Sequence, residues 1–322
     1  MHRVLIALPT LGRRPLDPLL TALVRQAREV RSSGYAAEVL LLDNSADGHG
    51  AVRNCAARHG VRCRRVPRRG FAQVRNAALD AAADHDALVF IDDDEIPEAG
   101  WLRALLEGAC THGADVVWGP VRAVVPPDAP RWLAGGRVLR PEWAQPDGPL
   151  IGVAASNNTL VRMAAVRRTG LSFEEAFDRS GGEDTVFFSR LAASGARMVW
   201  TGAAVVSETQ DADRLTLRGL AARWCRQGAA SAAAERTLRG RWGPRLTARR
   251  LARVPRGAAR IVRSGAARDP AWAAAGLEDL AFACGWARTA VRILLSAGPA
   301  AGSFGHRAGD GGRQAGDAQD TR

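Results

Sequence analysis

The stretch Ala87-Leu88-Val89-Phe90-Ile91-Asp92-Asp93-Asp94-Glu95 joins an apolar run directly to four consecutive carboxylates. The apolar run predicts a short buried strand, and the Ile96-Pro97 that follows is a place where a helix can begin. Carboxylates this close together cost free energy unless a positive group neutralises them. Ligands bind at strand ends of open α/β sheets, and divalent cations such as Mg²⁺ prefer carboxylate oxygens beside substrate phosphates. The stretch therefore predicts a site for a metal ion and a diphosphate, with a solvated acidic turn as the alternative.

Strand-like and helix-like patterns alternate around this stretch. We expect strands at 4–8, 39–42, 61–66, 88–91, 115–121, 153–161 and 197–206, and helices at 16–31, 51–58, 71–83, 98–112 and 185–194. This alternation predicts an α/β fold with βαβ units and a mainly parallel central sheet flanked by helices. The polar residues that end three of the first strands should then converge on one edge of the sheet. No GxGxxG or P-loop follows any strand, which disfavours a dinucleotide-binding fold and a P-loop NTPase.

Charge divides the chain of 322 residues into a neutral part and a basic part. There is no lysine, and residues 1–211 hold 25 Arg against 25 acidic residues, so the whole net charge of +12 lies in the last third. We expect a main domain at 1–230, an Arg-rich helical extension at 231–300 and a disordered tail at 301–322. Residues 126–149 are rich in Pro, Gly and Trp and predict a long surface excursion.

Cysteine usage and hydropathy bear on location. The five cysteines are odd in number and lack metal-ligand spacing, no secretion signal opens the chain, and no charge-free apolar run approaches 18 residues. These features predict free thiols in a reducing, cytoplasmic setting without a membrane span.

Five motifs follow one another in a meaningful order. They are Pro9-Thr10, Asp43-Asn44-Ser45, Gly70-Phe71-Ala72-Gln73-Val74-Arg75-Asn76, Phe90 to Glu95, and Gly181-Gly182-Glu183-Asp184. Together they resemble the family-2 glycosyltransferases, which have the GT-A-like nucleotide-diphospho-sugar transferase fold. The likeness covers about residues 3–230 and is nearest to the bacterial succinoglycan-type transferases of exopolysaccharide synthesis. It implies a metal-dependent, inverting glycosyltransferase (a hexosyltransferase) moving sugar from a UDP-sugar to a glycan or polyprenyl-diphosphate-linked acceptor.

The resemblance also implies roles for the first three motifs. Pro9 and Thr10 would line the nucleotide pocket through backbone groups, and Arg75 would reach the nucleotide. Asp43 would contact the base, with Asn44 beside it, where family members often carry a second Asp. From the residues alone, Asp43 and its neighbours could equally form a turn with side-chain hydrogen bonds, and Arg75 could be a surface residue.

The acidic stretch matches the Asp-x-Asp element of the family. The resemblance implies that Asp94 holds Mg²⁺ or Mn²⁺ on the diphosphate. Asp92, as the second metal ligand, would face the ribose or donor sugar, and Asp93 belongs to the same nucleotide-binding set. Glu95 is expected to be a simple first-turn charge.

The Gly-Gly-Glu-Asp motif matches the catalytic base of inverting members. Asp184 is the implied base that takes the acceptor proton, with Glu183 as the competing candidate; a helix cap is the alternative for Asp184. Further candidates for contacts with the diphosphate, acceptor or donor sugar are Asn157, Asn158, Arg223 and Arg226.

The basic third contains an unusual segment. Residues 236–263 hold ten Arg and no acidic residue, and six of them, spaced three or four apart from Arg245 to Arg263, share one helical face. Pro255 is expected to kink this helix. A basic amphipathic helix predicts a peripheral contact with an anionic membrane surface, against the alternative of a solvated Arg-rich face.

Two other classes of function stay open at this stage. A sugar-1-phosphate nucleotidyltransferase would need a Gly-rich basic loop after the first strand, which residues 9–14 match weakly. A nucleic-acid-binding protein would use the basic last third but would leave the acidic strand end without a role, so no nucleic acid partner is expected.

Overall fold

The computed structural model describes residues 1–46, 50–127, 129–130, 133, 145–150, 154–178, 180–210 and 215–296. Most of the expected excursion at 126–149 and the whole expected tail at 301–322 lie outside these residues.

A central mixed sheet of eight strands has the order β3-β2-β1-β4-β9-β6-β10-β8. The strands are β1 (His2–Thr10), β2 (Tyr35–Asp43), β3 (Arg62–Arg65), β4 (Ala87–Phe90), β6 (Val116–Trp118), β8 (Gly148–Pro149), β9 (Thr159–Arg162) and β10 (Met198–Trp200). The first four strands pair in parallel, as does β6 with β10, whereas β9 is antiparallel to both neighbours and β8 is antiparallel to β10. The expected mainly parallel sheet is thus confirmed for its N-terminal half.

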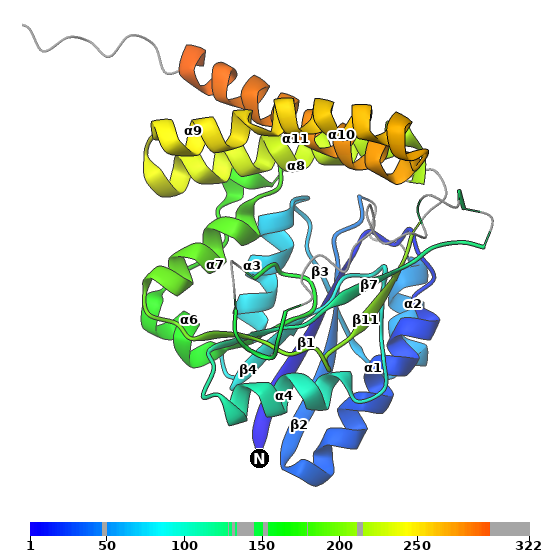
Figure 1. The fold of residues 1–322 in the computed structure, drawn as a ribbon. Coiled ribbons are helices and arrows are strands. Elements are labelled where there is room, and N and C mark those ends of the chain that lie inside the picture. The colour runs from blue at the N-terminus through cyan, green and yellow to red at the C-terminus, as the bar shows by residue number, and fades with distance from the viewer. Residues whose placement is uncertain are drawn as a thin grey trace, which may run out of the picture.

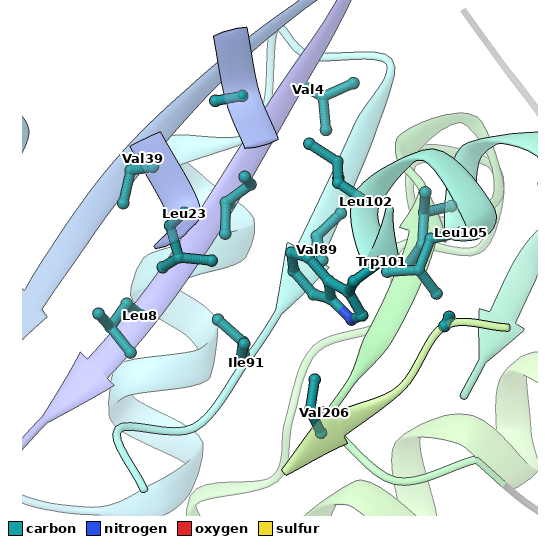
Figure 2. Packing of buried hydrophobic residues seen from close by; sticks show 14 of the residues in the cluster. Val4, Leu8, Leu23, Val39, Val89, Ile91, Trp101, Leu102, Leu105 and Val206 are labelled. Atoms are coloured by element: carbon teal, nitrogen blue, oxygen red, sulfur yellow. The ribbon is translucent and has the colours of Figure 1, made fainter. Parts of the chain in front are cut away.

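Helices cover both faces of this sheet. They are α1 (Asp17–Glu29), α2 (Gly50–Arg58), α3 (Phe71–Ala81), α4 (Trp101–Thr111), α6 (Met163–Thr169) and α7 (Glu183–Ala193), with 3₁₀ turns η1 (Val30–Ser33) and η2 (Glu175–Phe177). Alternate residues of β1 enter two separate cores: Ile6 packs on the α1 and α4 side, Leu5 on the α3, α6 and α7 side. Figure 2 shows the first core, where Trp101 of α4 lies close to Val89 and Leu105. Burial on both faces explains why β1 reads as a continuous apolar run.

A second, smaller sheet has the order β5-β11-β7, formed by β5 (Glu95–Pro97), β7 (Val121–Val124) and β11 (Val206–Thr209). The strands expected at 115–121 and 197–206 are each divided, because β6 and β10 remain in the central sheet while β7 and β11 leave it. Ile96 and Pro97, where a helix was expected to begin, instead pair with Ser207 and Val206 of β11.

The C-terminal part forms a layer of four helices: α8 (Leu217–Arg239), α9 (Pro244–Leu251), α10 (Arg253–Ala267) and α11 (Pro270–Ser296). Figure 1 shows this layer across the end of the sheet toward which β1 runs. The carboxyl ends of the parallel strands therefore face it. The expected domain boundary at residue 230 falls inside α8.

Close helix crossings hold the layer together. A Cβ on Gly228 of α8 would lie 2.1 Å from the carbonyl oxygen of Phe282, and one on Gly285 of α11 would lie 1.9 Å from that of Cys225. Gly257 of α10 and Gly276 of α11 meet in the same manner. Only glycine lets these helix backbones approach so closely.

Arginines of α10 point into the layer rather than out of it. The carboxylate of Asp279 on α11 is fully buried and receives Arg253, Arg256 and Arg260 at nitrogen–oxygen distances of 2.9, 2.6 and 2.8 Å. The arginine-rich face expected to meet solvent or membrane is therefore partly an interior face. The helix expected over 245–263 is interrupted at Ala252, between α9 and α10, three residues before Pro255, as a proline inside that helix predicts. Pro255 itself lies in the first turn of α10, where a missing N–H costs no helical hydrogen bond.

We expect Asp279→Ala to lower the free energy of unfolding by about 3 kcal/mol, because it leaves arginines in a partly buried site without their shared counter-charge. Urea denaturation followed by circular dichroism measures the change. Glu278→Ala is the matched control: its side chain is 35% exposed and contacts Arg253 at 3.2 Å, so the loss should stay below about 1 kcal/mol. Equal losses in both variants would contradict this account.

Among the described residues, none of the helices is both long and apolar enough to span a lipid bilayer.

Candidate active site

The four carboxylates follow β4 at the carboxyl edge of the sheet. Asp92, Asp93 and Asp94 form the turn that leads from β4 into β5, and each is partly buried. The carboxylates therefore do not all point into open water, as a solvated acidic turn would require.

Glu95, expected to be a simple surface charge, is instead 2% exposed. Its two carboxylate oxygens accept hydrogen bonds from the backbone N–H of Asp92 at 3.1 Å and from Nδ2 of Asn157 at 3.2 Å. Glu95 thereby closes the acidic turn and ties it to the segment before β9. The sequence carried little sign of this role for Glu95, because a run of four acidic residues does not show which of them points into the protein.

We expect Glu95→Gln to lower kcat/KM for sugar transfer about tenfold, in line with losses for residues that orient metal ligands. Both partners of Glu95 donate hydrogen bonds to it. The amide nitrogen of glutamine is also a donor, so one of these two hydrogen bonds is lost in the variant. Steady-state kinetics with the control Glu107→Gln, an exposed residue of α4, measures the effect. A Glu95→Gln enzyme as active as the control would show that the turn does not need this carboxylate.

Electrostatics in the turn favour the binding of a cation. Burial, reinforced by the neighbouring carboxylates of Asp94 and Asp93, raises the pKa of Asp92 to about 7, although Arg75 opposes the shift. Burial also raises the pKa of Asp93, against the hydrogen bond from Thr10, and that of Glu95. Burial, with a smaller effect of the neighbouring carboxylates, disfavours the charged forms of these groups. A divalent cation bound between them would offset that cost. The donor set of Asp92 and Asp94 thus suits Mg²⁺ or Mn²⁺.

Thr10, at the end of β1, contacts the acidic turn directly. Its hydroxyl donates a hydrogen bond of 2.6 Å to Oδ2 of Asp93 and accepts one of 3.0 Å from the N–H of Gly12. Arg14, farther along the same loop, lies 3.7 Å from Asp94. The loop that begins with Pro9 and Thr10 therefore borders the carboxylates, as the predicted convergence of strand ends requires.

Asp43 and Asn44, at the end of β2, are both buried. Asp43 accepts a hydrogen bond of 3.0 Å from the N–H of Ser45, which is the turn considered as an alternative. Asn44 donates to the carbonyls of Val66 and Arg68 at 2.9 and 2.8 Å. The side chain of Asn44 thus shapes the loop between β3 and α3, while the base contact of Asp43 stays a prediction.

The Gly70–Asn76 motif attaches α3 to a segment a hundred residues away. Asp178 caps α3 by accepting the N–H groups of Ala72 and Gln73 at 2.9 and 3.2 Å, and a Cβ on Gly70 would lie 2.2 Å from that carboxylate. Asn76 exchanges two hydrogen bonds with the backbone of Phe173, at 2.8 and 2.9 Å. Sequence reasoning missed Asp178 because its partners are distant in the chain.

Arg75 of α3 joins the two acidic motifs. Its guanidinium forms a buried ion pair with Glu183 at the start of α7, and its charge acts on Asp92. The rings of Phe71 and Phe173 lie 5.7 and 6.0 Å from its centre. The surface alternative for Arg75 is wrong, since only 11% of its side chain is exposed.

Asp184 and Glu183 therefore differ in environment. Glu183 is buried and engaged by Arg75, whereas Asp184 is half-buried and accepts a short hydrogen bond, 2.6 Å, from the N–H of Thr185. Gly182, just before them, has a φ of +101° and packs against the backbone of Ala230 in α8. The motif thus contacts the helical layer, and Asp184 is the more exposed of its two carboxylates.

Asn157 and Asn158 separate into two roles. Asn157 contacts Glu95, as described above. Asn158 is fully buried: its Oδ1 accepts from the indole of Trp101 at 2.6 Å, and its Nδ2 donates to the carbonyls of Ala204 and Pro120 at 2.7 and 2.9 Å. With donor and acceptor groups engaged in the core, Asn158 is a structural residue rather than a sugar contact.

The arginines proposed from α8 also differ. Arg223 donates a hydrogen bond of 3.4 Å to Gln210, which is buried directly after β11, while Arg226 is exposed. Neither has a contact with the acidic turn among the interactions described, so their roles remain predictions.

The fold and the acidic turn define the class: a GT-A-like enzyme, whose carboxylates at the sheet edge suit a nucleotide diphosphate and its metal. The chain belongs to glycosyl transferase family 2, because residues 6–170, half of its length, match the model of that family. The expected GT-A-like fold class is thereby confirmed, as is the glycosyltransferase reading.

One curated relative is the succinoglycan biosynthesis protein ExoM of Rhizobium meliloti (strain 1021), 38% identical over 164 residues. That match spans 50% of this chain and 52% of the relative. Among solved structures, S. aureus TarS has a TM-score of 0.53 at 14% identity over 86% of this chain and 55% of that one. TarS 1-349 in complex with UDP-GlcNAc has a TM-score of 0.50 at 14% identity, covering 92% of each chain. These structures show a shared fold.

Proposed function

We propose that this chain moves a sugar from a nucleotide-diphospho-sugar, most simply a UDP-sugar, to an acceptor hydroxyl with inversion at the anomeric carbon. The proposal is supported above all by the buried ion pair of Arg75 with Glu183, since the same guanidinium charge also lowers the pKa of Asp92 in the acidic turn. A donor-binding group and a base must lie close together for an in-line displacement, and no continuous stretch of sequence contains both.

Each part of the site has a role in this reaction. Asp94 and Asp92 would hold Mg²⁺ or Mn²⁺, whose charge would favour departure of the nucleoside diphosphate. Asp43 and the backbone of Pro9 and Thr10 would hold the nucleoside. Asp184, the more accessible carboxylate of its motif, would take the proton of the acceptor hydroxyl.

The pathway proposed is polysaccharide or glycoconjugate synthesis, with a glycan or polyprenyl-diphosphate-linked acceptor at the cytoplasmic face of a membrane. The likeness to ExoM over half of each chain supports this choice. The division into a transferase domain to about residue 230 and a helical extension remains part of the proposal.

A panel of UDP-, GDP- and dTDP-sugars with Mn²⁺, followed by thermal unfolding, tests the donor class. Stabilisation by UDP-sugars that disappears with EDTA is the expected result, since a ligand bound only to the folded state raises its melting temperature. Stabilisation by none of the nucleotides would overturn the proposal.

A further inference from the structure

The outer face of α9 and α10 combines exposed apolar side chains with arginines. Leu251 at the end of α9 and Val254 and Val262 of α10 are 45%, 46% and 75% exposed. Within α10, Val254, Ala258 and Val262 recur at the four-residue spacing of one helical face, and all three are exposed. Surface helices normally turn their apolar stripe toward the core. On α10 the order is reversed, because the inner face carries the arginines that meet Asp279.

The charge around this stripe is of one sign. Residues 244–267 contain no acidic residue, and Arg245 and Arg249 of α9 are exposed. Arg263 of α10 is exposed as well, with its guanidinium over the ring of Trp272. The carboxylates that contact α9 or α10 are those of Asp279, Glu235 and Glu278, and each of them pairs with an arginine.

All four acidic side chains of the layer are engaged within it. They contact arginines or cap a helix: Glu235 with Arg250, Glu278 with Arg253, Asp279 with three arginines, and Asp269 with the N–H of Ala271. The outward surface of α9 and α10 therefore carries exposed arginines and no acidic side chain of its own.

We propose that an anionic lipid bilayer docks on the outer face of α9 and α10. Apolar side chains of this size enter the boundary between headgroups and acyl chains, while flanking arginines attract anionic headgroups. A nucleic acid would match the charge but would leave the exposed leucine and valines in water. The residues that make contact are therefore Leu251, Val254 and Val262 with the outer arginines, not the inner arginines of α10.

Co-sedimentation of the full chain with vesicles tests the proposal. The protein should bind vesicles of phosphatidylcholine with phosphatidylglycerol and stay in solution with phosphatidylcholine alone. Leu251→Gln/Val262→Gln should weaken binding at least about tenfold, as should Arg245→Glu/Arg249→Glu, since both the apolar and the ionic contributions are needed. Arg31→Glu/Arg103→Glu is the matched control, because it makes the same charge change at exposed residues of η1 and α4, far from the helical layer (Figure 1).

Two further measurements keep the outcomes distinct. Hydrogen exchange of the unmodified protein should show slower exchange across 249–266 when anionic vesicles are added, which needs no variant to fold. UDP binding by each variant, compared with its vesicle binding, separates failure of the docking surface from failure of the proposed sugar transfer. Three results would overturn the proposal. The first is that the unmodified protein does not bind anionic vesicles at all, and the second is that the variants bind them as well as the control does. The third is binding of duplex DNA that Leu251→Gln/Val262→Gln leaves unchanged.

Discussion

Asp94→Ala is expected to abolish metal-dependent binding of UDP, with a loss of affinity of about 100-fold or more. Asp94 and Asp92 are the carboxylates proposed to hold the cation, and residues that merely orient metal ligands already contribute 10- to about 100-fold. Isothermal titration with UDP and Mn²⁺ measures the loss directly. Without Mn²⁺, the variant and the unmodified protein should bind UDP equally weakly.

A matched control separates this effect from a general change of charge. Asp80→Ala removes an exposed carboxylate at the end of α3 and should bind UDP and Mn²⁺ normally. Unchanged affinity in Asp94→Ala would refute its role as a metal ligand, and the acidic turn would then need another explanation.

Asp184→Asn should lower kcat by about 10³-fold, within the range that a general base contributes, while donor affinity stays within about threefold. The amide keeps the shape and the hydrogen bond to the N–H of Thr185 but cannot accept the proton of the acceptor. Single-turnover transfer from the donor, beside donor binding by titration, distinguishes the two effects.

Glu183→Gln is the informative comparison, since the ion pair with Arg75 gives Glu183 a positioning role. Glu183→Gln should affect donor binding and stability together with turnover, because Arg75 would lose the charge of its buried partner. The roles of the two residues would be exchanged if Asp184→Asn kept full turnover while Glu183→Gln bound the donor normally but transferred no sugar.

The environment of Arg75 explains why its replacement would not be a local change. Through the N–H of Ala72 and the side chain of Asn76, the helix that carries Arg75 is hydrogen-bonded to Asp178 and Phe173. The sequence of the Gly70–Asn76 motif predicts a binding site. In the structure, most of its residues instead connect α3 to the segment at 173–178.

The sequence by itself determined the alternation of strands and helices and the position of the acidic turn. The apolar run of β1 and the helical spacing in α1 can be recognised from residues that are neighbours in the chain. Polar residues that follow parallel strands must lie at the same edge of the sheet. The family resemblance, carried by five ordered motifs, likewise needed no coordinates.

Only the tertiary structure decided which polar side chains face each other. Glu95 against Asn157, Arg75 against Glu183, and α10 against Asp279 are pairings between segments that periodicity does not connect. An arginine stripe has the same spacing whether it faces water or a buried carboxylate, so its direction depends on what packs against it. The free energy of burying a charge depends on its partner in space, and that partner is set by the fold of the whole chain.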